Sequence, residues 1–212
     1  KNLWEVNHKK LNIQKKSKKF YFLKTKIMIK KLFKKYPQID NVNSINNLKV
    51  QKINDILKKI PWKKLFNGHY SDIHGDLQFD NIIVSKNKIK LIDWRPNFSK
   101  FISKGDLYYD FSKLLGGLEI NYDLIKKNKF SVKEHQNKVQ IKHNSRKNNS
   151  KLKKILLNYI NKKNFDINKV EMITGLIFLN MSPLHHYPFD KFLFYYGKSY
   201  LQKILNNTNF DD

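Results

Sequence analysis

The chain has 212 residues, of which 43 are Lys or Arg and 17 are Asp or Glu, and its formal net charge is +26. A composition that is 40% hydrophobic predicts a globular protein with a buried core. The absence of cysteine excludes disulfides and thiolate metal sites, and no apolar run approaches the roughly 18 residues that a membrane-spanning helix needs. Because the first residues also lack an apolar signal segment, we expect a cytoplasmic protein without an integral membrane segment.

The positive charge by itself favours nucleic-acid binding, because clustered Lys and Arg release counterions from phosphate backbones. Only two arginines occur, Arg95 and Arg146, although arginine is preferred for bidentate contacts to phosphates and bases. Alanine is absent while Lys, Asn, Ile, Phe and Tyr are abundant, which is typical of an AT-rich coding sequence. We therefore interpret most of the charge as solvated surface and expect no nucleic-acid partner.

Residues 1–62 are predicted to be helical and basic. Within residues 43–60, apolar side chains recur at i, i+3, i+4 and i+7, and Pro61 stops the helix that this spacing indicates. Residues 20–36 predict another helix, which Pro37 follows. We treat this region as the helical N-terminal part of a larger lobe.

The pattern changes to short β-branched runs in the next part of the chain. Residues 81–84 and 89–92 are two such runs on either side of a polar stretch, which predicts a small β-hairpin. Helical spacing returns at residues 107–115, and Gly116 and Gly117 are expected to form its C-terminal cap. Residues 63–120 thus form a second predicted part, with the hairpin at its centre.

The last part, residues 121–212, is expected to be mostly helical. Weak alternation over residues 130–143 indicates a second hairpin, which turns near Gln136 and Asn137. Three helices follow by their apolar spacing, over residues 152–160, 167–180 and 189–205. The expected fold class is α+β, mostly helical, with one small central hairpin.

One motif carries the candidate chemistry. Residues 74–81 read HGDLQFDN, and twelve residues after Asn81 stands Asp93, inside the run LIDW. A third segment, GDLYYDF, covers residues 105–111. The first residue of one hairpin strand pairs with the last residue of the next, so Asn81 and Asp93 are expected at the same end of the predicted hairpin.

These three segments resemble the HxDxxxxN catalytic loop, the metal-binding aspartate and the GDxxxD helix start of the aminoglycoside phosphotransferase and choline kinase family. The resemblance implies the C-terminal lobe of a protein-kinase-like fold and a reaction that uses ATP and Mg²⁺. It implies that Asp76 accepts or orients the proton of an acceptor hydroxyl, while Asn81 and Asp93 bind the metal and through it the nucleotide.

The same resemblance assigns structural support to three further residues. His74 is expected to hold the catalytic loop rather than to transfer protons. Asp106 and Asp110 resemble helix N-terminal residues that accept backbone N–H bonds and brace that loop.

Gln78 stands where protein kinases often carry a basic residue that contacts the γ-phosphate, so that contact is in doubt here. His185 and His186 lie in a loop where the family builds its acceptor pocket, and acceptor contact and loop packing stay open for both.

The family also has an N-terminal lobe that binds ATP, and this sequence does not predict one. No glycine precedes Gly68, so residues 1–62 hold no glycine-rich phosphate loop. We expect that the ATP-binding lobe is absent from this chain, that function needs an upstream N-terminal lobe, and that this stretch alone is poorly active.

The expected function is an ATP-dependent phosphotransferase that acts on a hydroxyl of a small molecule such as an amino alcohol, a sugar or a glycan precursor. A polycationic aminoglycoside would need an acidic pocket, which a chain of charge +26 supplies poorly. Two alternatives stay open: a catalytically inactive kinase-like binding module, and a basic nucleic-acid-binding protein.

Overall fold

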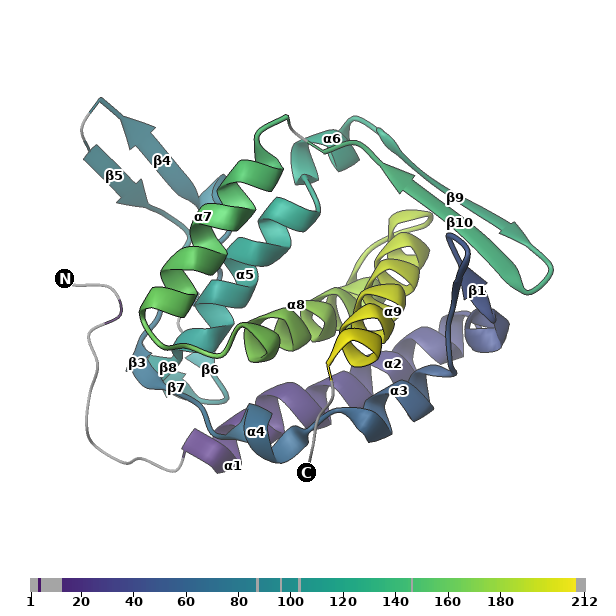
Figure 1. Ribbon diagram of the computed structural model, residues 1–212, viewed down its shortest axis with the longest axis horizontal. Coiled ribbons are helices and arrows are strands. Elements are labelled where there is room, and N and C mark those ends of the chain that lie inside the picture. Colours follow the sequence, from purple (N-terminus) through teal and green to yellow (C-terminus); the bar gives the residue numbers. More distant parts are fainter. Residues whose placement is uncertain are drawn as a thin grey trace.

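The computed structural model describes Trp4 and residues 13–86, 88–95, 97–102, 104–145 and 147–208. It confirms a mostly helical α+β fold, in which small sheets lie at the edges of a helical body (Figure 1). Among the described residues, none of the helices has the length and apolar character required to cross a membrane.

The helices are α1 (Ile13–Ser17), α2 (Lys24–Lys35), α3 (Ile53–Lys59), α4 (Trp62–Phe66), α5 (Leu107–Glu119), α6 (Tyr122–Lys126), α7 (Asn149–Lys162), α8 (Ile167–Met181) and α9 (Phe189–Asn207). A π-helical turn, η1 (Lys18–Leu23), joins α1 to α2. The 3₁₀ turns are η2 (Ile39–Asn41), η3 (Phe79–Asn81) and η4 (Ser182–Leu184).

The strands are short. They are β1 (Ser44–Ile45), β2 (Leu48–Lys49), β3 (Tyr70–Asp72), β4 (Ile82–Ser85), β5 (Lys88–Leu91), β6 (Asn97–Phe98), β7 (Phe101–Ile102), β8 (Lys104–Asp106), β9 (Phe130–His135) and β10 (Lys138–His143). β3 pairs with β8, β4 with β5 and β6 with β7, while a four-stranded sheet has the order β2-β1-β10-β9. This last sheet joins the N-terminal and C-terminal parts of the chain.

The centre of the molecule is the packing of α8 against α5 and α9 (Figure 1). α8 is buried along most of its length, and from Met172 to Leu179 it is almost entirely apolar, as expected for a helix in the centre of a protein. α8 and α9 approach closely at Gly175 and Gly197, and a Cβ atom on Gly175 would lie 2.7 Å from the Leu201 side chain. Glycine at these two positions therefore permits the close approach, and a larger residue at Gly175 would have to displace the Leu201 side chain.

Several sequence predictions are confirmed. The hairpin expected after Asn81 forms from β4 and β5, with Ile82 opposite Leu91. Its expected central place is wrong, because it projects from the edge of the helical body and is one of several small sheets (Figure 1). β9 and β10 form the second hairpin, and its turn lies at the predicted residues Gln136 and Asn137. The C-terminal helices α7, α8 and α9 cover the three ranges predicted from apolar spacing.

The helical face predicted at residues 53–60 is confirmed by α3, but the prediction that the residues from 43 to 52 are also helical is wrong. α3 begins only at Ile53, and the residues before it form the β1–β2 hairpin. Asn46 and Asn47 have φ values of 47° and 65°, a left-handed turn that asparagine tolerates. β1 pairs with β10 in parallel and buries Ile45 opposite Val139, so tertiary pairing outweighs the local spacing.

The predicted glycine cap of α5 is also wrong. The helix runs through Gly116 and Gly117 to Glu119, and Ile120 is its C-cap. A Cβ atom on Gly117 would lie 2.9 Å from the ring of Phe79. This glycine therefore admits the aromatic ring of the loop before β4 and does not supply a left-handed cap.

Candidate active site

The loop of residues 73–81 runs from β3 to β4 and carries the HGDLQFDN motif. β3 is paired with β8, which leads directly into α5, so this pairing holds the start of the loop next to the start of the helix. Gly75 has a φ of 81°, a conformation that glycine adopts without steric cost. The chain turns there and exposes the Asp76 carboxylate to a neighbouring cleft.

Two buried carboxylates hold the start of this loop in place: Asp106, the N-cap of α5, and Asp110, in the first turn of that helix. Asp110 accepts hydrogen bonds from the backbone N–H groups of His74 and Gly75 at 2.8 and 2.9 Å, and from the indole of Trp4 at 3.2 Å. Burial raises the pKa of Asp110 above its usual range, and these donors oppose that shift. Asp106 caps α5 and accepts from Tyr21 and from the backbone of His69.

His74 is fully buried and links the loop to the end of β5. Its Nε2 lies 2.9 Å from the carbonyl oxygen of Ile92, which requires a proton on Nε2 because a carbonyl only accepts. Its Nδ1 then accepts the backbone N–H of Asp76 at 3.3 Å. With both ring nitrogens engaged, His74 positions Asp76 relative to the residue that precedes Asp93.

Asn81 lies at the start of the hairpin, and its backbone oxygen accepts a hydrogen bond from the N–H of Ile92 at 3.0 Å. Its side-chain Nδ2 donates to the backbone oxygen of Asp76 at 2.8 Å. The Oδ1 atom of the same amide accepts no hydrogen bond from the described part of the chain. Asn81 is thus oriented by its nitrogen, and its oxygen is available as a ligand.

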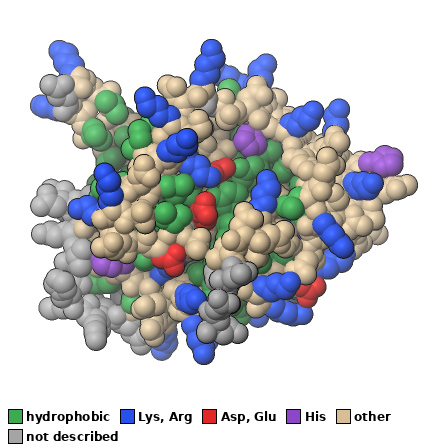
Figure 2. All heavy atoms as spheres, viewed as in Figure 1, with side chains coloured by type: hydrophobic (Ala, Val, Ile, Leu, Met, Phe, Trp, Pro, Cys, Tyr) green, Lys and Arg blue, Asp and Glu red, His purple; other side chains and the backbone are tan. Residues whose placement is uncertain are grey.

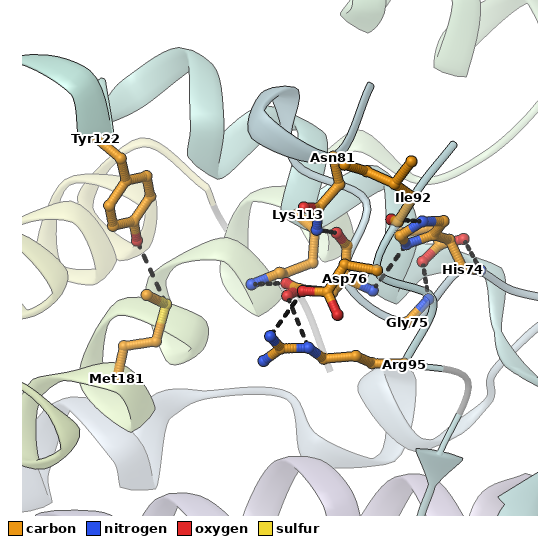
Figure 3. Close-up of polar contacts among 11 residues, drawn as sticks. His74, Gly75, Asp76, Asn81, Ile92, Arg95, Lys113, Tyr122 and Met181 are labelled. Carbon is orange, nitrogen blue, oxygen red and sulfur yellow. Dashed lines mark hydrogen bonds and ion pairs between the residues drawn. The ribbon is translucent and has the colours of Figure 1, made fainter. Parts of the chain in front are cut away.

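Asp93 and Asp76 share one cation. Asp93 has a φ of 52°, a left-handed conformation that aspartate adopts more readily than most residues. Its Oδ2 lies 2.7 Å from Nη2 of Arg95, while Nε of the same guanidinium lies 3.6 Å from Oδ2 of Asp76 (Figure 3). The two carboxylates proposed for catalysis and metal binding therefore meet at one positively charged group.

A second cation at Asp76 was not expected from the sequence. Lys113, on α5, places its Nζ 2.7 Å from Oδ1 of Asp76, and both side chains are only 10% exposed (Figure 3). Gln78, at the position where a basic residue was sought, makes no such contact in the described residues. The sequence carried one signal for this contact. Lys113 lies about one helical turn after Asp110 on α5 and therefore faces the same loop.

A cleft of about 960 Å³ opens beside Asp76. Its walls come from η1 and α2, from the loop of residues 73–81, from α5 and from the segment around Met181. Tyr122 donates a hydrogen bond to the sulfur of Met181 at one end of the site (Figure 3). On the face shown in Figure 2, Lys and Arg side chains are scattered widely, and most of the few acidic ones lie near the middle.

Some of the predicted site residues line this cleft, and the others lie outside its lining. Asp76 lines the cleft together with Arg95, Lys113 and His185, whereas Asn81, Asp93 and His186 are not part of its lining. Burial lowers the pKa of His185, and the charges of His186 and Lys113 lower it further. Of the two adjacent histidines, His185 is the one placed for contact with a bound molecule.

The oxygen atoms of Asn81, Asp93 and Asp76 are donors that suit a hard divalent cation such as Mg²⁺. Among the described residues, no three His, Asp or Glu side chains converge to form a metal cage. The candidate donors are the amide oxygen of Asn81 and the exposed carboxylate of Asp93, which a metal would have to share with Arg95, with the Asp76 carboxylate close by. This fits Mg²⁺, which commonly binds one or two protein groups and completes its shell with substrate phosphates and water.

Comparison with known protein families, with curated proteins and with solved structures finds no match to this chain. The functional conclusion therefore depends on the residues and geometry described above.

Proposed function

We propose that this chain carries the active site of an ATP-dependent phosphotransferase that acts on a hydroxyl group of a small molecule. Within this proposal the fold is the C-terminal lobe of a kinase-like enzyme of the aminoglycoside phosphotransferase and choline kinase type. The observation that carries it is the meeting of the Asp76 and Asp93 carboxylates at Arg95, beside the oriented amide of Asn81.

In this reaction the acceptor oxygen forms a bond to the γ-phosphorus of ATP, and the bond from that phosphorus to the β,γ-bridging oxygen breaks. ADP leaves with the bonding electron pair. Asp76, which borders the cleft, orients the acceptor hydroxyl and receives its proton. Asn81 and Asp93 would hold Mg²⁺, which when bound would supply positive charge to neutralise the phosphate oxygens.

Two basic residues complete the charge balance of the proposed site. Lys113 pairs with Asp76 and keeps its carboxylate fixed at the wall of the cleft. Arg95 belongs to the same short segment as Asp93, and its backbone N–H donates to the carbonyl oxygen of His74 at 2.9 Å. Preorganised charges of this kind supply much of the catalysis in phosphoryl transfer.

Calorimetric titration with ATP, in the presence and absence of Mg²⁺, tests the proposal on a protein that carries this chain together with the N-terminal ATP-binding lobe that the proposed function requires. Metal-dependent binding is expected for the wild type and lost in Asp93→Ala. The matched control is Asp55→Ala, which removes a carboxylate that pairs with Lys58 on the surface of α3. Binding that ignores Mg²⁺, or that Asp93→Ala leaves intact, contradicts the proposed function.

A further inference from the structure

The cleft beside Asp76 has an excess of positive charge. Among the described residues, six basic side chains line it and two acidic ones, Asp76 and Asp80. The basic residues are Lys19, Lys24, Arg95, Lys100, Lys113 and Lys126. Three of them have carboxylate partners at the site: Arg95 and Lys113 contact Asp76, and Lys126 lies 3.9 Å from Asp80.

Lys24 differs from these three cations. It is half-buried, and within the described ranges of the chain no carboxylate pairs with it. Its Nζ lies 4.7 Å from the centre of the Phe20 ring, which is a weaker contact for a cation than an ion pair. Burial lowers the pKa of Lys24, and repulsion from Lys113 lowers it further. An anion bound between these two lysines would relieve that repulsion.

The rest of this wall is apolar. Phe20, Leu23, Ile27 and Met28 line the cleft around Lys24, and the side chains of Leu23 and Ile27 are 43% and 63% exposed. Leu184, from η4, also lines the cleft and is 58% exposed. Apolar surface of this kind, next to a few polar groups that fix orientation, is typical of small-molecule sites.

We propose that this cleft binds an anionic acceptor, a small molecule with a carboxylate or phosphate on an apolar or sugar body, and that Lys24 is its main charge contact. The assignment of this molecule as the acceptor rests on the proposed phosphotransferase function. A cationic acceptor such as an amino alcohol is disfavoured by the same excess of positive charge.

The anionic group has two possible sources, the acceptor itself or the phosphates of the nucleotide. The position of Lys24 favours the acceptor, because Lys24 and its apolar neighbours belong to the cleft, whereas Asn81 and Asp93 lie outside its lining. A site for nucleotide phosphates alone would also have no need for the apolar wall.

Calorimetry with 1-naphthyl phosphate, 1-naphthol, 1-naphthylmethylamine and inorganic phosphate tests this proposal without metal or ATP. The wild type is expected to bind 1-naphthyl phosphate best, and more weakly as salt is added. Lys24→Met, which keeps the aliphatic stem over Phe20, is expected to weaken binding by about tenfold, or roughly 1.4 kcal/mol. Lys31→Met on the same helix is exposed and outside the cleft, and is expected to leave binding unchanged.

Equal affinity in Lys24→Met and wild type overturns the proposal, as does tighter binding of the amine than of the phosphate ester. Inorganic phosphate binding as tightly as the ester would identify a nucleotide-phosphate site and also overturn it. If circular dichroism shows that Lys24→Met does not fold, the same comparison is made with Lys24→Gln. Binding by the wild type that does not weaken as salt is added would then also overturn the proposal. If the ester binds in a Lys24-dependent way but the wild type shows no metal-dependent ATP binding, the proposed phosphotransferase function is refuted while the anion site in the cleft stands.

Discussion

Arg95 donates to Asp93 across 2.7 Å, so the proposed metal ligand is already neutralised by a side chain two residues away. Both partners are well exposed, and an exposed ion pair contributes only about 0 to 1 kcal/mol. A divalent ion bound to Asp93 must compete with this guanidinium. Arg95 therefore sets the metal affinity of the site without being a ligand.

Replacement of Arg95 by methionine is expected to tighten Mn²⁺ binding by about two- to fivefold, the range that corresponds to a surface ion pair. Electron paramagnetic resonance of free Mn²⁺ measures this affinity. Lys90→Met is the control, because Lys90 is an exposed cation on β5 that makes no contact with Asp93. Weaker Mn²⁺ binding in Arg95→Met would show that the guanidinium organises the site rather than competing for it.

The pair of Lys113 and Asp76 is expected to couple strongly in stability. Both side chains are largely buried, and loss of one partner leaves the other charge poorly compensated. In urea unfolding, Lys113→Met and Asp76→Asn should each destabilise the fold, and the double variant should recover part of the loss. A coupling of about 1 to 3 kcal/mol is expected. Additive effects would show that the pair does not act as a unit.

The hairpin and its ends were predictable because Asn81 and Asp93 flank two short apolar runs that a polar stretch separates. Neither Lys113 nor Arg95 was identified from the sequence as a partner of Asp76. Helical spacing places Lys113 on the face of Asp110, but both contacts depend on how α5 and the segment after β5 pack on the loop. The β1 strand was missed for a related reason. Its pairing with β10 joins residues far apart in sequence, and local helical spacing carries no information about that partner.

The two adjacent glycines of α5 give a matched test of packing. Gly116→Ala places its Cβ 3.6 Å from Phe178, an ordinary contact, so the gain in helix propensity of about 1 kcal/mol should appear as added stability. Gly117→Ala meets the Phe79 ring at 2.9 Å and should displace it. We expect Gly117→Ala to be less stable than Gly116→Ala by about 1 kcal/mol or more in urea unfolding. Equal stability would mean that Phe79 moves freely.

His185 should make the protein less stable in mild acid. Its folded pKa is lowered by burial and by the charges of His186 and Lys113, against the raising effect of Asp190. As pH falls through about 6.5, the unfolded chain binds a proton that folded His185 does not, so the free energy of unfolding decreases. The other charged and titratable groups of this cleft are Asp76, Asp80, Tyr109, Tyr122 and its six basic residues.

The measurement is the slope of unfolding free energy against pH, from about pH 5 to 6.5, for wild type and His185→Gln. A shallower slope in the variant is expected, with no difference in pH dependence above pH 7, where the imidazole is neutral in both states. An unchanged slope would contradict a lowered pKa of His185 in the folded protein.

The most direct test of the account is where a divalent ion binds. Addition of substoichiometric Mn²⁺ to the ¹⁵N-labelled chain broadens the amide resonances of residues close to the metal. We expect broadening centred on Asp76, Asn81 and Asp93, and its loss in Asp93→Ala. Broadening spread over surface carboxylates such as Asp55 and Glu134, and unaffected by Asp93→Ala, would contradict the metal site and with it the proposed phosphotransferase.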